Sequence, residues 1–185
     1  MTRQELDDVT LERARRGDRN AFRRLVERYE RPVFALLARM LYASGQESLV
    51  EDLAQETFVR VFHGLAAFGA DGRLNLSGWI LTIAARLAID ELRRPPRVES
   101  LSDGIPDEAR ADRESERRGL AAAIGRAVEQ LSPEQRAVFL LREVHGLEYD
   151  AIAESLAIDL GTVKSRLSRA RAALRAALSG IHDET

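Results

Sequence analysis

The residues best suited to chemistry lie in one basic segment near the C-terminal end of the chain. From Thr162 to Arg175 the segment carries five basic side chains and no acidic one, although the whole chain has 28 basic and 30 acidic residues. The five are Lys164, Arg166, Arg169, Arg171 and Arg175. Lysine and arginine side chains bind phosphates and displace their counterions. Because the net charge is −2, attraction to a nucleic acid would have to come from this local patch.

Apolar residues in the same segment recur with the period of an amphipathic helix. At about 100° per residue, one stripe should face a core, and it consists of Val163, Leu167, Ala170 and Leu174. The opposite face carries Ser165, Ser168, Arg169 and Ala172, with Arg166, Arg171 and Arg175 on its flanks. Such a layout fits base edges and phosphates in a DNA groove. The alternative is a solvated helix with arginines on its outer side, and the absence of acids argues against it.

A preceding helix should support this one. Ile152, Ala153 and Leu156 give the preceding segment an apolar face of its own. Asp159 is placed to cap the second helix by accepting from its free N–H groups. The two segments therefore predict a helix-turn-helix between Glu148 and Leu178.

Further upstream, Ser132 to Gln135 reads SPEQ, a capping box with proline at the first helical position. The helix that begins there should end at Gly146. The first half of the chain predicts helices and no strand. We expect a helix over Glu5–Arg16 and a second that Asp18 caps and that runs through Tyr29. Further helices are expected over Val50–Leu65 and Leu76–Arg94, with a loop over Phe68–Asn75.

Two positions in this half bear on packing. Pro32 should kink or restart the second helix, because proline removes a backbone hydrogen bond. In the Val50–Leu65 segment, Phe62 belongs to the periodic apolar face that is expected to point inward. The outer face is acidic toward the N-terminal end. The predicted fold class is all-α, with an N-terminal bundle at residues 1–94 and a C-terminal helix-turn-helix domain at residues 119–185. Residues 95–118 lose the apolar periodicity and are predicted to form a flexible linker.

Composition narrows the functional classes. Apolar residues make up 45% of the chain and charged residues 31%, which is typical of a globular protein. The chain has no cysteine and three scattered histidines, so we expect no disulfide, metal site or cofactor. The sequence shows no catalytic nucleophile paired with a general base and no phosphate-binding loop, so nothing in it indicates an enzyme. No apolar run is long enough to cross a membrane, and no signal peptide is evident, which favours a cytoplasmic protein without direct membrane insertion.

Four stretches together resemble the extracytoplasmic-function (ECF) sigma factors, a two-domain group of the bacterial sigma-70 family. EDLAQETFVRVFHGLAAF and GWILTIAARLAIDELRR are similar to region 2 of that family. LSPEQRAVFLLREVHGLEYDAIAESL and GTVKSRLSRARAAL are similar to region 4. The resemblance implies a transcription initiation factor that binds core RNA polymerase and directs it to specific promoters, in a stress or envelope response. It also implies a separate anti-sigma factor as regulator.

The resemblance assigns roles to individual positions. Those matching the segment that docks on the coiled coil of the polymerase β′ subunit are Asp52, Leu53, Gln55, Glu56 and Phe58; the β subunit is a further expected partner. Those matching the reader of the −10 promoter element are Arg73, Trp79 and Arg86. Those matching the reader of the −35 element are Lys164, Ser165, Ser168 and Arg169. Those expected nearer to DNA phosphates are Arg142, Arg166 and Arg171.

Trp79 has two interpretations, because a lone tryptophan is more often a core residue than a platform for an unpaired base. The sequence departs from the family pattern at two positions. Leu87 stands where the family usually has asparagine, and Ala157 stands where it usually has the glycine of the helix-turn-helix turn.

Two other functional classes fit parts of the sequence. A LuxR-like transcriptional regulator shares the helix-turn-helix but should carry a receiver or ligand domain with alternating strands and helices. An all-helical adaptor or anti-sigma protein would explain the bundle but not the acid-free basic helix.

Overall fold

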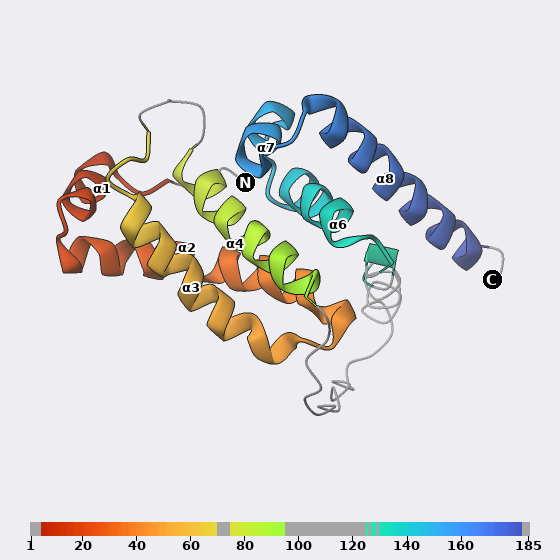
Figure 1. Cartoon of the computed structure of the whole chain (residues 1–185), viewed down its shortest axis with the longest axis horizontal. Coiled ribbons are helices and arrows are strands. Elements are labelled where there is room, and N and C mark those ends of the chain that lie inside the picture. The colour runs from red at the N-terminus through yellow and green to blue at the C-terminus, as the bar shows by residue number, and fades with distance from the viewer. Residues whose placement is uncertain (1–4, 70–74, 95–124, 126, 129, 183–185) are drawn as a thin grey trace.

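The computed structural model describes residues 5–69, 75–94, 125, 127–128 and 130–182, without the side chains of residues 43 and 178–182. Within these ranges the chain forms helices and no strand, as predicted (Figure 1). The predicted linker, residues 95–118, lies outside the described residues. The α-helices are α1 (Asp8–Arg15), α2 (Arg19–Leu41), α3 (Val50–Gly64), α4 (Leu76–Leu92), α6 (Pro133–Phe139), α7 (Tyr149–Leu156) and α8 (Leu160–His182).

Aspartates begin the first two helices. Asp7 accepts a hydrogen bond from the Thr10 N–H at 2.9 Å, so α1 starts later than the predicted Glu5. Asp18 accepts from the N–H groups of Asn20 and Ala21 at 2.9 and 3.1 Å, which confirms it as the cap of α2. Each bond satisfies a donor that the first helical turn leaves without an intrahelical partner.

The second helix does not restart at Pro32, and that alternative is wrong. It runs from Arg19 to Leu41 as one element with Pro32 inside it. A proline in a helix interior costs about 3 kcal/mol, but the residues around it are buried on one face, among them Tyr29, Val33 and Leu36. Burying that face offsets the lost hydrogen bond, because each large apolar side chain contributes about 1.5–3 kcal/mol.

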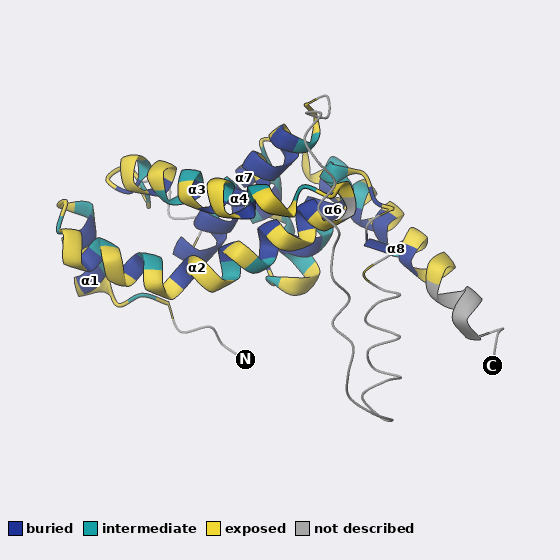
Figure 2. Cartoon of the chain, turned by 90° about the horizontal axis from the view of Figure 1, so that it is seen from below, coloured by how far each residue is buried: buried dark blue, intermediate teal, exposed yellow. Residues whose placement is uncertain are grey.

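Helix α4 lies at the centre of the molecule. It packs against α2 and α3 on one side and against α6 and α7 on the other (Figure 1). Its sequence is apolar almost all round, and Ile80, Leu81 and Ala84 are 0 to 1% exposed. A helix that is hydrophobic all round is expected to be buried. Figure 2 shows the buried surfaces of the helices turned toward one another and the exposed surfaces turned outward.

The C-terminal half begins with the predicted capping box. Ser132 accepts from the Gln135 N–H, and the Gln135 side chain accepts from the Ser132 N–H, each at 3.3 Å. Helix α6 continues into a π-helical turn at Leu140–Val144, and Gly146, with φ 73°, ends it as predicted. Helix α8 then packs against both α6 and α7.

The two halves share one hydrophobic core. Its buried residues include Leu36, Met40 and Ile80 from the first half and Leu141, Ile152 and Leu167 from the second.

A buried arginine joins the halves across this core. Arg136 is 4% exposed and donates to the carbonyl oxygens of Val128 and Leu131 at 3.2 Å. Its Nη1 also donates to the carbonyl oxygen of Met40, near the C-terminal end of α2. On the surface nearby, Arg93 of α4 and Glu134 of α6 form an ion pair at 2.7 Å.

Candidate functional site

Helix α8 presents the side chains predicted for the −35 element to solvent. Lys164, Ser165, Ser168 and Arg169 are exposed. The opposite stripe is closed off: Val163, Leu167, Ala170 and Leu174 are 0 to 8% exposed and pack inward. The rotation of the helix therefore agrees with its periodicity, and the acid-free face is exposed.

Two of the three arginines predicted to lie near phosphates are already engaged. Arg171 donates from Nε to Glu143 Oε1 at 3.1 Å and from Nη2 to the Tyr149 hydroxyl at 3.4 Å. The hydrogen bond with Glu143, followed by the one with Tyr149, raises the pKa of Arg171. Arg142 donates to the Leu147 carbonyl at 2.9 Å and lies 4.9 Å from the centroid of the Tyr149 ring.

Tyr149 is a residue of this surface that sequence reasoning missed. It stands at the first position of α7, between the two arginines that contact it. Aromatic residues at helix starts have no distinctive pattern, so only the three-dimensional placement reveals it. The third predicted phosphate contact, Arg166, is half-buried.

The turn of the helix-turn-helix keeps the geometry of a glycine turn without the glycine. Ala157 has φ 52° and ψ 50°, the left-handed region. Its N–H donates to the Glu154 carbonyl at 3.1 Å, and the Ile158 N–H donates to the Ala153 carbonyl at 2.9 Å. This pair of bonds is a Schellman motif, which normally has glycine at the left-handed position. The departure at Ala157 therefore changes the strain of the turn and not its path.

The residues predicted to bind the polymerase divide between two faces of α3. Asp52 and Gln55 are exposed, and Glu56 is half-buried and forms an ion pair with Arg60 at 2.7 Å. Leu53 and Phe58 are partly buried and pack against the core.

One prediction on this helix is wrong, because Phe62 points outward. Its exposure is 48%, and its ring meets Phe22 edge-on with centroids 5.1 Å apart. The neighbouring Val59 is 49% exposed. Helix α3 therefore offers apolar surface beside its acids. The helical wheel alone could not show this, because Val61 fills the adjacent core position and is fully buried.

The residues predicted for the −10 element are only partly brought together. Arg73 lies outside the described residues. Trp79, near the start of α4, is half-buried, and its ring lies 4.8 Å from that of Phe68 at an interplanar angle of 32°. Arg86 is exposed further along α4, and Leu87 beside it is 6% exposed. The departure at Leu87 thus places an apolar side chain in a buried position, where it fits the packing.

A cavity of about 400 Å³ separates Arg86 of α4 from Arg166 of α8. The turn between α7 and α8 also lines it, through Leu156, Ala157 and Ile158. One predicted −10 contact and one predicted phosphate contact therefore face the same space between the halves.

Comparisons with known proteins bear on this arrangement of a helical bundle and a basic helix-turn-helix. The family model described as sigma-70 region 2 matches residues 25–97, and the model described as sigma-70 region 4 matches residues 121–174. The RNA polymerase sigma-H factor of Pseudomonas aeruginosa is 34% identical over 191 residues, which cover 96% of each chain. The chain belongs to the sigma-70 family. It is a transcription initiation factor that binds core RNA polymerase and directs it to specific promoters.

Other relatives place this sigma factor in the ECF group. The ECF RNA polymerase sigma-E factor of Escherichia coli strain K12 is 32% identical over 187 residues, covering 94% of this chain and 95% of the relative. Among solved structures, CnrH in complex with the cytosolic domain of CnrY matches with a TM-score of 0.63 and 26% identity, over 93% of this chain and 96% of CnrH. The sigma factor RpoE of Bartonella quintana, in complex with the anti-sigma factor NepR, matches with a TM-score of 0.55 and 25% identity, over 85% of this chain and 96% of RpoE.

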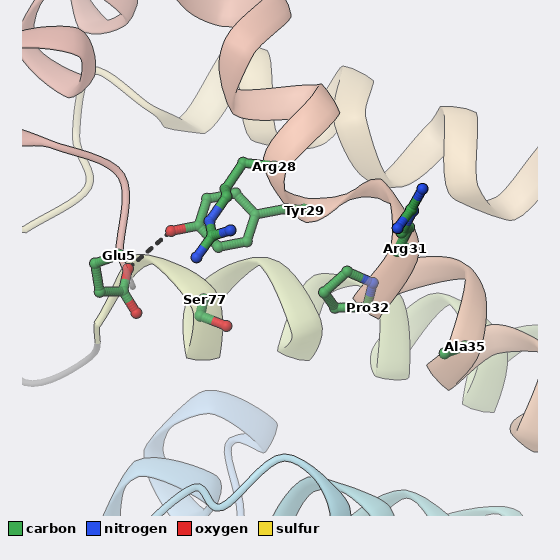
Figure 3. Close-up of a pocket in the computed structure, with 7 residues that line it drawn as sticks. All are labelled: Glu5, Arg28, Tyr29, Arg31, Pro32, Ala35 and Ser77. Atoms are coloured by element: carbon green, nitrogen blue, oxygen red, sulfur yellow. Dashed lines mark hydrogen bonds between the residues drawn. The ribbon is translucent and has the colours of Figure 1, made fainter. Parts of the chain in front are cut away.

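A second cavity of the sigma factor, also of about 400 Å³, lies beside α2 and the start of α4 (Figure 3). Its lining consists of Glu5, Arg28, Tyr29, Arg31, Pro32, Ala35 and Ser77. The Tyr29 hydroxyl donates to Glu5 Oε2 at 2.8 Å and accepts from the Leu6 N–H at 3.2 Å. Burial, reinforced by the Glu5 hydrogen bond, raises the pKa of Tyr29 to about 12. These bonds fasten the N-terminal segment to α2, which is a structural role.

Metal and membrane sites were expected to be absent. Among the described residues, no group of three or more histidine, cysteine, aspartate or glutamate side chains could hold a metal ion. None of the helices that the structure describes has both the length and the apolar character needed to cross a bilayer.

Proposed function

We propose that three surfaces of the protein have separate roles: one binds the polymerase, one reads the −10 element and one reads the −35 element. In this proposal the outer face of α3, with Asp52, Gln55 and Glu56, binds the β′ coiled coil of the polymerase. Leu53 and Phe58 support that face from below, and the β subunit contacts the rest of the protein. Region 2 reads the −10 element with Arg73, Trp79 and Arg86. Region 4 reads the −35 element with Lys164, Ser165, Ser168 and Arg169.

The observation that carries the proposal is the outward, acid-free face of α8. All four side chains proposed to read the −35 element are exposed, and the apolar residues on the other side are buried. A helix must present this pattern to place its side chains against base edges in the major groove. Arg142, Arg166 and Arg171 would contact the flanking phosphates. Glu143 must then release Arg171, because a single guanidinium cannot serve both partners fully.

We also propose the setting in which this occurs. The chain has no catalytic activity of its own and works in the cytoplasm, where core polymerase and promoter DNA are found. An anti-sigma factor holds it inactive until a stress or envelope response. Its solved relative from Bartonella quintana is bound to such a partner. In this proposal residues 1–94 form the region 2 domain, residues 95–118 the linker and residues 119–185 the region 4 domain.

Transcription with purified components tests the polymerase contact. The chain is mixed with core polymerase and a supercoiled promoter library, and both binding and initiated transcripts are measured. The double reversal Asp52→Arg with Glu56→Arg should abolish binding and transcription while helicity is kept, because neither side chain is in the core. The control is Glu30→Arg, an exposed acid on α2. Equal affinity of the double variant and this control would remove the role proposed for α3.

The regulator is tested by recovery from the native cell. Pull-down should yield a stoichiometric protein that competes with core polymerase. Recovery of a free, monomeric and fully active sigma factor from unstressed cells would instead point to control of its expression.

A further inference from the structure

Two hydrogen bonds hold the described residues near Trp79, one of the residues proposed to read the −10 element. Asn75 caps α4 by accepting from the Gly78 N–H at 2.7 Å. The carbonyl oxygen of Phe68 accepts a hydrogen bond from Arg15 Nη2 at 2.6 Å. Arg15 belongs to α1, 53 residues earlier in the chain. A side chain of the first helix therefore holds the chain at Phe68.

Arg15 contacts Phe68 in two ways. Besides its bond with the Phe68 carbonyl, its guanidinium carbon lies 5.7 Å from the centroid of the Phe68 ring. The Phe68 ring also contacts Trp79, 4.8 Å away between centroids. The three side chains form a row that links α1, the end of the α3 turn and α4. Displacing Arg15 would remove one end of the row and leave the Phe68 carbonyl without its arginine donor.

Two glycines make this row possible. Gly69 has φ 88°, a left-handed conformation, and a Cβ added there would lie 2.8 Å from Arg15 Nη2. Gly64 lies beneath the indole, where an added Cβ would be 3.0 Å from Trp79 Cζ2. The backbone thus passes close to the guanidinium and the indole, so a side chain at Gly69 would displace the guanidinium and one at Gly64 would push against the indole.

The environment of Arg15 is unlike that of its neighbour. Its side chain is 29% exposed, and its Nε is buried without a hydrogen-bond partner among the described residues. Its ion pair with Glu12 is long, at 3.7 Å. Arg16 has the same charge, is 77% exposed and pairs with the same Glu12 at 3.0 Å. Arg15 thus contacts the Phe68 carbonyl oxygen, at 2.6 Å, more closely than it contacts the acid of its own helix.

We propose that Arg15 is a positioning residue for promoter opening. It holds Phe68 against Trp79, so that the indole proposed to read the −10 element keeps its position when unpaired −10 bases bind. Arg15 does not itself touch DNA. Without Arg15, Phe68 and Trp79 would have to be ordered when the bases bind. The cost of that ordering would weaken binding. This inference rests on the proposed role of region 2 in −10 recognition.

The test uses the full chain assembled with core polymerase. Arg15→Ala is compared with Arg16→Ala, which removes the same charge from the same helix end. The probe is a forked promoter DNA whose −10 bases on the non-template strand are unpaired. Arg15→Ala should lower affinity for this probe by about tenfold and relax base preference at the −10 positions. Arg16→Ala should stay within about twofold of the wild type, as an exposed surface change. Core binding and −35 preference should be unchanged in both.

Further variants keep the test decisive. Gly69→Ala should reproduce the defect of Arg15→Ala, because its Cβ would displace the guanidinium. Arg15→Lys keeps the charge and should restore part of the affinity, since a lysine can still donate to the Phe68 carbonyl. If Arg15→Ala fails to fold, judged by helical circular dichroism, Gly69→Ala and Arg15→Lys replace it.

Each outcome has a distinct meaning. Equal affinities of the Arg15 and Arg16 variants for the forked probe, or an unchanged Gly69→Ala, would overturn the positioning role. Failure of the wild-type protein to bind the unpaired −10 bases would instead overturn the proposed function, before any variant is compared.

Discussion

Replacing Ala157 by glycine should stabilise this sigma factor. Ala157 is exposed and has φ 52°, so its Cβ is strained against the following carbonyl without gaining burial. A left-handed conformation costs an L-residue about 1–2 kcal/mol. Glycine removes that strain but has more freedom in the unfolded chain, which takes back about 0.4–1 kcal/mol. The net gain in the free energy of unfolding should be about 0.5–1 kcal/mol.

Thermal unfolding followed by circular dichroism measures the effect. For a chain of 185 residues, 1 kcal/mol corresponds to a rise in Tm of about 2–4 °C. The matched control is Ala173→Gly, at an exposed position inside α8. That change should destabilise by about 0.5–1 kcal/mol, because glycine is unfavourable in a helix interior.

Both substitutions replace an exposed alanine by glycine, so a difference in their effect on stability must come from the backbone conformation at each position. Opposite signs would support the left-handed turn. If both variants lost stability equally, Ala157 would have to be helical in solution, and the described path between α7 and α8 would be wrong. Promoter preference should not change in Ala157→Gly, since the turn keeps its two hydrogen bonds.

Three further predictions concern other parts of the structure. Arg136→Ala should lower the free energy of unfolding by about 3–5 kcal/mol, because the carbonyl oxygens of Met40, Val128 and Leu131 lose the arginine donor at about 1–3 kcal/mol each. The exposed Arg175→Ala should change it by less than about 0.5 kcal/mol, and urea denaturation compares the two. Arg169→Ala should alter preference at single −35 positions by about 1–3 kcal/mol, while Arg171→Ala should weaken all promoters alike and flatten the salt dependence; binding to a set of single-base promoter variants at several salt concentrations would expose the reverse pattern. Asp18 accepts from the Ala21 N–H and from Arg13, and these bonds lower its pKa in the folded protein from the ordinary 3.8. The ionised carboxylate therefore stabilises the fold above pH 3.8, and this stabilisation is lost as the pH falls through the lower pKa of the folded state. Asp18→Asn should flatten the acid side of a plot of Tm against pH.

Local features of the fold were predictable from the sequence. The basic helix, its buried stripe and the capping box at Ser132 each depend on residues within one or two turns of each other. Short-range patterns of this kind survive in any compact arrangement. The resemblance of regions 2 and 4 then supplied the family and its function, which the periodicity alone could not.

Features that depend on distant contacts were not predictable. The hydrogen bond from Arg136 to Met40 spans 96 residues of sequence, and no local sequence pattern predicts it. The continuation of α2 through Pro32 depends on burial against other helices, which overrides the local effect of proline. The outward position of Phe62 depends on Phe22 of another helix. The engagement of Arg171 by Glu143 likewise required the packing of α8 against the end of α6. DNA and polymerase contacts of the candidate residues stay predictions.

The core shared by the two halves limits how this protein can be recombined with its relatives. Exchanging the C-terminal half of one sigma factor for that of another assumes that each half folds alone. Here the Met40 carbonyl would lose its arginine donor unless the incoming half supplied one at the position of Arg136. The α4 surface, with Gly78 beneath the Leu147 side chain, would also need a matching neighbour. A workable chimera must therefore keep the contact residues of both halves from one parent and exchange only the outer face of α8.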